Sequence, residues 1–198
     1  PPTLGHSIFH GQSERNQTFI RGDYQLDNSN NFSFVFLNSV AKYQIPTLPG
    51  QTPNANVTGL LPGGFSAVPS ERVDENQKEN NQYGHMVWRH DVNSSNFFSL
   101  SGYVRQTRAT FRTDPFNLLA YTADPAEPFS AASQDRNAYS GGIRFDHTYI
   151  PNKEHVIKAG FQVDRTQTWN KTRLFTFADD GAGNPTGNVL GLDADNRL

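Results

Sequence analysis

Charged side chains of both signs recur at every second position in several stretches of the chain. In the stretch 139–149, Arg144 and Asp146 alternate with Ile143 and Phe145. Nine residues share this placement: Arg21, Asp23, Arg89, Asp91, Arg105, Arg144, Asp146, Lys158 and Asp164. Mixed charges spaced in this way suit hydrogen bonding along one polar surface, because alternate residues of a strand point to the same side. The chemistry they predict is recognition and passage rather than bond making.

Signals for bond-making chemistry are missing from the sequence. There is no G-x-S-x-G motif and no glycine-rich phosphate loop, and the absence of cysteine excludes disulfides and thiolate metal sites. His85 and His90 lie five residues apart, so the two imidazoles would point to opposite sides of one strand. We therefore predict no catalytic residue, no metal site and no cofactor. A net charge of -2 without a basic cluster also argues against a nucleic-acid partner.

The elements that must position the charged residues are β-strands joined as hairpins. Apolar and polar residues alternate with a period of two, and short turns rich in Asn, Asp, Ser or Pro separate the paired stretches. In the second stretch both faces are apolar, which leaves its register ambiguous, and Phe19 falls on the polar side of the first. The predicted strands cover about 17–26, 32–43, 82–92, 97–112, 138–149 and 155–168.

The connections between hairpins differ strongly in length from the turns within them. Long irregular segments are predicted at about 44–81, 113–137 and 178–198, the first of them rich in proline. Short turns on one side with long loops on the other are typical of transmembrane β-barrels. A mean hydropathy of -0.66, with no apolar run long enough for a spanning helix, excludes a helical membrane protein.

We therefore predict an all-β fold. It is an antiparallel meander of about six strands, a segment of a large transmembrane β-barrel with short periplasmic turns and long extracellular loops. Because the smallest closed membrane barrels have about eight strands, and because the chain begins with Pro1 rather than Met, we expect an excerpt of a longer chain with two unpaired edges.

On such a barrel the nine charged residues would face the lumen, where they line a wet passage, bond to a plug, or simply solvate the inner wall. Trp88 and Trp169 lie near opposite ends of their predicted strands, as two interfacial aromatic girdles require, although a soluble core would also bury both. Phe65, Phe116, Tyr121 and Phe129 belong to the long loops. They would contact ligand, or they would pack against neighbouring loops.

Three stretches carry a family resemblance. The sequences NQTFIRGDYQL at 16–26, WRHDVNSSNFFSL at 88–100 and HVIKAGFQVD at 155–164 resemble barrel strands of TonB-dependent outer-membrane receptors. The resemblance is one of strand style and hairpin rhythm over most of 16–168, and neither a plug domain nor an aromatic-terminated last strand is present in this sequence.

The resemblance implies a barrel of about 22 strands around a plug in the bacterial outer membrane. It further implies uptake of a scarce small ligand with energy delivered through TonB. The partners would be outer-membrane lipid, the plug, TonB and the ligand. Three alternatives stay open: a passive porin, a soluble secreted β-sandwich for adhesion or glycan binding, and an outer-membrane enzyme.

Overall fold

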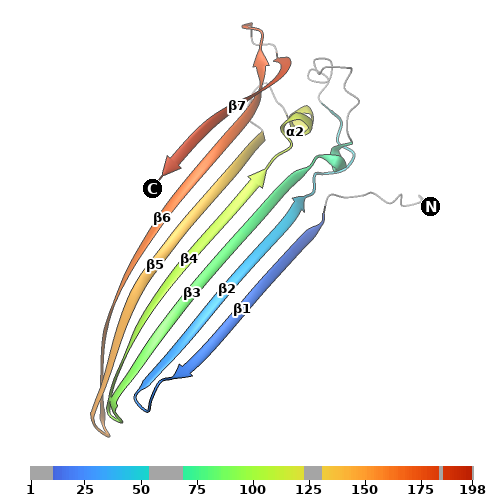
Figure 1. The fold of residues 1–198 in the computed structure, drawn as a ribbon. Helices are drawn as coiled ribbons and strands as arrows, with labels where there is room; N and C mark the ends of the chain where they lie inside the picture. Colours follow the sequence, from blue (N-terminus) through green and yellow to red (C-terminus); the bar gives the residue numbers. More distant parts are fainter. Residues whose placement is uncertain (1–10, 54–68, 123–130, 183–184, 198) are drawn as a thin grey trace, which may run out of the picture.

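The structure is a computed structural model that describes residues 11–53, 69–122, 131–182 and 185–197. These residues form one antiparallel sheet of seven strands in chain order (Figure 1). The strands are β1 Ser13–Gln25, β2 Asn30–Ile45, β3 Glu75–Asn93, β4 Asn96–Arg112, β5 Ala131–Asn152, β6 His155–Asp179 and β7 Pro185–Arg197. The predicted all-β antiparallel meander is confirmed, and the curved sheet is not closed by hydrogen bonds between β1 and β7.

The strand count and several boundaries differ from the prediction. A seventh strand, β7, occupies most of the segment 178–198 that was predicted as a loop, and it pairs with the part of β6 beyond residue 168. β7 was missed because its glycine, asparagine and aspartate residues hide the alternation. The segments 44–81 and 113–137 are also shorter loops than predicted, because β3 begins at Glu75 and β5 at Ala131.

The β1–β2, β3–β4 and β5–β6 turns are each held by an Asx-type hydrogen bond, in which a side-chain carbonyl or carboxylate accepts from a backbone N–H two residues on. Asp27 Oδ1 accepts from the N–H of Ser29 at 2.8 Å. Asn93 and Asn152 do the same for the β3–β4 and β5–β6 turns at 2.9 and 3.0 Å. All three turns lie at one end of the sheet, opposite the longer connections (Figure 1).

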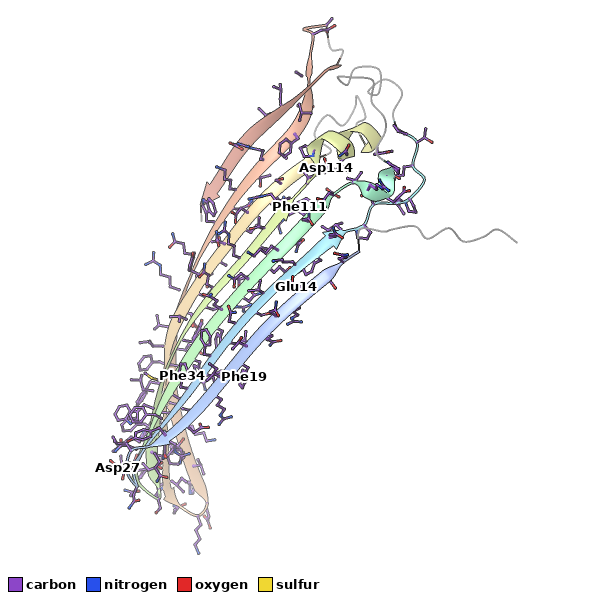
Figure 2. All side chains as sticks on the ribbon, turned by 45° about the vertical axis from the view of Figure 1, so that its right-hand side comes forward. Glu14, Phe19, Asp27, Phe34, Phe111 and Asp114 are labelled. Carbon is purple, nitrogen blue, oxygen red and sulfur yellow. The ribbon has the colours of Figure 1, made fainter. Side chains whose placement is uncertain are left out.

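The two faces of the sheet differ in chemistry. The register places Phe34, Met86, Gly102, Ile143 and Val163 in one cross-strand row, on what we call the apolar face. Large side chains are solvent-exposed there, including Val104 at 68% and Val163 at 61% (Figure 2). The opposite face, which we call the polar face, carries the charged residues. The described residues form one sheet with no second layer over either face, so they build no hydrophobic core between layers.

The apolar face is apolar only in its part nearest the turns. One row further from the turns than Phe36, Gly84 and Val104, the same face carries a row of polar residues. This row consists of Thr18, Asn38, Gln82, Gln106, Tyr139 and Gln167. The apolar side chains between this row and the turns form a band across β1–β6, which we call the apolar band.

The buried residues gather at the other end, where the connections pack together. Val73 and Ala131 are the fully buried apolar residues among those described. A short 3-10 helix, η1 Ser70–Arg72, and a helix, α2 Pro115–Thr122, lie here, inside segments that were predicted as irregular. Ser70 Oγ donates to the carbonyl of Leu48 at 2.8 Å, which ties the first connection to η1. No helix in the described part of the chain is long and apolar enough to cross a membrane.

Candidate functional site

The structure brings all nine predicted charged residues onto the polar face. Asp23 and Arg144 share one cross-strand row, although four strand pairings separate them. Arg89 and Asp146 share the next row. The strand period therefore collects residues that are far apart in the sequence onto one polar surface, near the turn end of the sheet.

Three arginines on this surface are paired with an aspartate two positions later on the same strand. The Nε–carboxylate distances are 2.9 Å for Arg21–Asp23, 2.9 Å for Arg89–Asp91 and 2.7 Å for Arg144–Asp146. The first and third pairs are bidentate, since an Nη atom also donates to the second carboxylate oxygen. The R-x-D spacing on β1, β3 and β5 is a sequence signal for these pairs, because residues i and i+2 share a strand face.

Two glycines let polar side chains lie flat on this surface. The Tyr103 hydroxyl donates to Asp164 Oδ1 at 2.6 Å, across the intervening strand β5. At Gly142, which lies between them, a Cβ would overlap the Asp164 carboxylate and stand 2.8 Å from Tyr103 Cε1. At Gly160 a Cβ would stand 2.6 Å from the carbonyl oxygen of Phe145. Glycine is required at both positions by close approach.

Six of the nine form Arg–Asp ion pairs, and Asp164 instead accepts hydrogen bonds from Tyr103 and Gln162. Arg105 and Lys158 form no ion pair within the described part of the chain. Arg105 lines a shallow hollow of about 340 Å³ with Leu37, Tyr83 and Tyr103. The rings of Tyr83 and Tyr103 are 6.3 Å apart. This hollow combines an unpaired cation with aromatic surface at mid-height on the polar face.

Trp88 belongs to an aromatic row that crosses five strands on the apolar face, near the turns. The row consists of Phe32, Trp88, Phe98, Phe145 and Phe161, with successive ring centroids 6.3, 5.5, 5.8 and 5.8 Å apart. Trp88 Nε1 donates to Asn30 Oδ1 at 3.0 Å. Of this row, only Trp88 was singled out from the sequence; the cross-strand register is what brings the phenylalanines beside it.

Trp169 lies on the same face as Trp88 but beyond the apolar band. It is six residues past Val163 on β6, and its partner on β5 is Asn137. This places it about 20 Å further along the strand. Its indole Nε1 is buried and has no hydrogen-bond partner.

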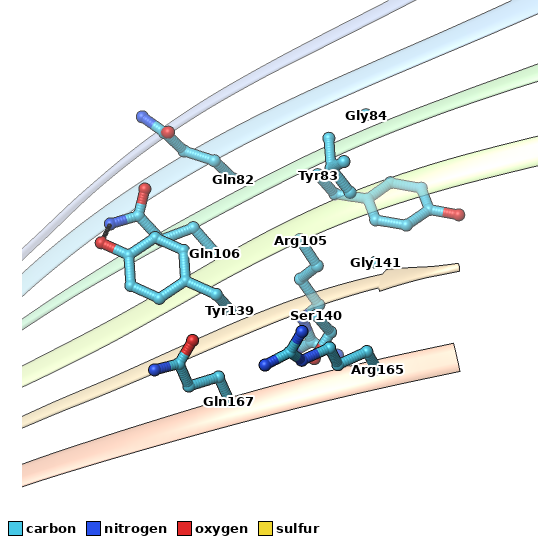
Figure 3. Close-up of a pocket in the computed structure, with 11 residues that line it drawn as sticks. Gln82, Tyr83, Gly84, Arg105, Gln106, Tyr139, Ser140, Gly141, Arg165 and Gln167 are labelled. Carbon is cyan, nitrogen blue, oxygen red and sulfur yellow. Dashed lines mark hydrogen bonds between the residues drawn. The ribbon is translucent and has the colours of Figure 1, made fainter. Parts of the chain in front are cut away.

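Another hollow lies on the apolar face, where the apolar band meets the polar row (Figure 3). It measures about 600 Å³, and Gln106 Nε2 donates to the Tyr139 hydroxyl at 2.9 Å inside it. Gln82, Arg165 and Gln167 also line it. The amide groups belong to the polar row and mark the height at which this face stops being apolar, whereas Arg165 lies one row nearer the turns, in the row of Val104 and Gly141.

The four predicted loop aromatics are only partly described. Phe65 and Phe129 lie outside the described residues, and Phe116 lies on α2, where the helix backbone alone is described. Tyr121, also on α2, is half-buried. Burial raises the pKa of its hydroxyl, and the negative charge of Glu71 in η1 raises it further. α2 contacts η1, so the two long connections pack on each other.

Glu75 is a half-buried carboxyl at this end of the sheet. Burial raises its pKa, and the charge of Asp114 adds to the effect. The Thr113 hydroxyl donates to Glu75 Oε1 at 2.9 Å, which opposes the rise. These contacts connect the start of β3 to the segment that leads into α2. No group of three His, Asp or Glu side chains suited to a metal occurs among the residues that the structure describes.

Comparison with known protein families, with curated protein sequences and with solved structures found no match to this chain.

Proposed function

We propose that the chain is a membrane-spanning segment of a TonB-dependent outer-membrane receptor, which takes up a scarce small ligand. The observation that carries the proposal is the apolar band, which is exposed on one face of a sheet whose other face is polar. In water such a band would be a large exposed apolar patch of the kind that marks an interaction or membrane surface. Against lipid it is the expected outer surface of a barrel.

The extent and the borders of the band support this placement. On β4 it runs over residues 98–104 and on β5 over 141–149, which is about 20–26 Å along the strands and, at a strand tilt of about 40°, about 15–20 Å across the membrane. Outer-membrane barrels carry an outward apolar band about 25 Å tall, bordered by aromatic girdles. The aromatic row at the turn end corresponds to the periplasmic girdle, and the polar row with Tyr139 corresponds to the outer boundary.

The polar face then lines the lumen. Its arginines are largely neutralised by their own aspartates, so the wall is well hydrated but nearly neutral. Arg105 and Lys158 are left to meet whatever occupies the lumen, either a plug or a passing ligand. The partners are outer-membrane lipid on the apolar face, a plug and TonB from other parts of the receptor, and the small ligand.

Two features favour a receptor over the alternatives. The strands extend well beyond the apolar band, with β6 reaching 25 residues, and the long connections form a packed layer through α2 and η1. A soluble β-sandwich would need a second sheet over the apolar face, whereas the described residues form one sheet. A passive porin shares the band, so energy dependence separates it from a receptor.

Nitroxide scanning tests the membrane placement directly, because the chain has no cysteine and every introduced one is unique. Labels at Leu100→Cys and Ser101→Cys in a bilayer form a matched pair on opposite faces of β4. We expect the label at 100 to be relaxed by oxygen dissolved in lipid, and the label at 101 by a water-soluble nickel chelate. Nickel access at both positions would refute the proposal.

Energy dependence tests the receptor assignment separately. Ligand uptake by cells that carry the protein should stop when the proton-motive force is collapsed. Uptake that continues would identify a passive porin instead.

Quenching of tryptophan fluorescence by spin-labelled lipids would locate the two membrane interfaces, and we expect it for both Trp88 and Trp169. Absence of quenching at both would remove their girdle role.

A further inference from the structure

Two lysines face each other on the part of the apolar face that lies beyond the apolar band. Lys42 of β2 and Lys78 of β3 are direct cross-strand partners. Like charges in this position destabilise a sheet. Glu14, the β1 partner of Lys42, is 4.0 Å from Lys42 Nζ, at the outer limit of an ion pair. Lys78 forms no ion pair within the part of the chain that the structure describes.

The two lysines line one hollow together with a third cation, Arg112, and with the hydroxyl-bearing Thr110. Its volume is about 570 Å³. Three cations and the single carboxylate of Glu14 leave a formal charge of 3 − 1 = +2 at this hollow. Asp135 on the next strand is close enough to Arg112 to be influenced by it, but its carboxylate is held by two bonds from Arg108 at 3.0 and 2.5 Å.

Several arginines elsewhere on the sheet are paired with a carboxylate. Arg21, Arg89, Arg144 and Arg173 each contact an aspartate at 2.5–2.9 Å. At the hollow the positive charges instead stand side by side with one distant carboxylate. A bound anion would remove the repulsion between the two ammonium groups.

We propose that this hollow binds a phosphate group carried on a saccharide. A phosphate monoester has a charge of about −1.5 to −2 at neutral pH, which matches the charge of the hollow. The ammonium groups and the guanidinium offer strong charge-assisted donors. The Thr110 hydroxyl donates to Asp135 Oδ1 at 3.5 Å and would have to turn to reach the phosphate. A hollow of about 570 Å³ is larger than a phosphate and leaves room for a sugar ring.

The height of the hollow above the membrane excludes the headgroup of a phospholipid as the source of the phosphate. This step rests on the proposed function. Lys42 is six residues past Phe36, about 20 Å along the strand. With a strand tilt of about 40° the rise above the hydrocarbon is about 15 Å. The headgroup layer of a phospholipid is only about 5–8 Å thick. The phosphate therefore belongs to a saccharide that extends from an outer-leaflet glycolipid, or to a soluble sugar phosphate.

Calorimetric titration tests the site without any lipid. The full chain, in neutral detergent micelles, is titrated with glucose 1-phosphate and, as the neutral control, with glucose. The test variant is Lys42→Gln with Lys78→Gln. The matched control is Lys171→Gln, because Lys171 lies in the same cross-strand row and on the same face but outside the hollow. We expect glucose 1-phosphate to bind the unaltered chain and the control equally and the double variant about tenfold or more weakly.

Circular dichroism melting checks that the double variant is folded; we expect it to be at least as stable as the unaltered chain, because the lysine repulsion is gone. No binding of the sugar phosphate, or equal weakening in both variants, would overturn the proposal. A second experiment, in nanodiscs that contain a phosphorylated glycolipid or its dephosphorylated form, distinguishes a glycolipid from a soluble sugar phosphate. Protection of Lys78 from acetylation that depends on the glycolipid's phosphate identifies the glycolipid. Protection by glucose 1-phosphate alone identifies the soluble sugar. Failure of micelle binding would leave the nitroxide result intact, so the two proposals fail separately.

Discussion

Arginine substitutions along β3 give a sharp test of the proposal that the apolar face meets lipid. Met86 lies on the apolar face, within the apolar band, and is 57% exposed. Val87, the next residue, lies on the polar face at the same height. Gln82 shares the face of Met86 but belongs to the polar row at the edge of the band. Met86 and Val87 therefore differ in the face of the sheet that they occupy, and Met86 and Gln82 differ in height on the same face.

The expected costs follow from the depth of each position. An arginine that faces lipid near the bilayer midplane destabilises an outer-membrane barrel by about 2–4 kcal/mol, whereas one near the interface costs about 0–1 kcal/mol. Met86→Arg should therefore lower the folding equilibrium constant by about 30- to 900-fold. Val87→Arg and Gln82→Arg should each change it by less than about fivefold.

Reversible urea unfolding of the chain in phosphocholine vesicles measures the three free energies. Circular dichroism is the suitable signal, because Trp88 is close enough to Met86 and Val87 for the substitutions to perturb its fluorescence. Equal costs for Met86→Arg and Gln82→Arg would show that the band has no depth dependence. In that case both positions meet water, and the membrane placement is wrong.

Three further predictions concern the polar face and the end of the sheet opposite the turns. Gly142→Val should destabilise the chain by about 1–3 kcal/mol in the same urea assay, because the new side chain overlaps Asp164 and Tyr103. The control Gly22→Val, at a position with open space, should destabilise the chain far less. Equal destabilisation by the two substitutions would contradict the close-approach argument. Arg108 lowers the pKa of Asp135 chiefly by hydrogen bonding, so this pair stabilises the fold above the ordinary carboxyl pKa and the gain is lost as pH falls through the lowered value. Asp135→Asn should remove that acid-side loss from a stability profile against pH, and an unchanged profile would refute it. Burial raises the pKa of Glu75, so its contribution is fully present below the ordinary carboxyl pKa and is lost as pH rises through the raised value; Glu75→Gln should therefore be more stable than the unaltered chain at pH 7, and lower stability at pH 7 would show that the Thr113 hydrogen bond dominates instead.

Much of the sheet was predictable because the strand period leaves little freedom once one face is apolar. A shift of one residue would exchange the two faces of a strand, so the alternation in 139–149 and 155–164 already fixes which residues lie together. β2 was ambiguous because Phe34 and Phe36 alternate with Val35 and Leu37. The structure resolves it through pairing with both neighbours.

Other features depend on partners that one strand cannot reveal. Phe19 falls on the polar face, where its cross-strand row continues through Leu37 to Tyr83. It therefore has apolar and aromatic cross-strand neighbours on that face and is not an error in the alternation. β7 was missed for the opposite reason, since its own residues carry weak strand propensity and it is defined mainly by its pairing with β6.

The described residues bury little apolar surface within the sheet, so the sheet alone does not account for the stability of the fold. Folding must offset about 1–2 kcal/mol of backbone entropy for each ordered residue, and burial of apolar surface is the main opposing contribution. Here that burial is confined to the end of the sheet opposite the turns, around Val73 and Ala131. Among the described residues, the long turn-proximal part of the sheet has hydrogen bonds between strands but no second layer. Its apolar face is left uncovered by these residues, and its β1 and β7 edges offer unpaired backbone groups that further strands would satisfy. Under the proposed function, lipid on the apolar face and strand pairing at both edges would meet these two requirements together, as closure of a membrane barrel does.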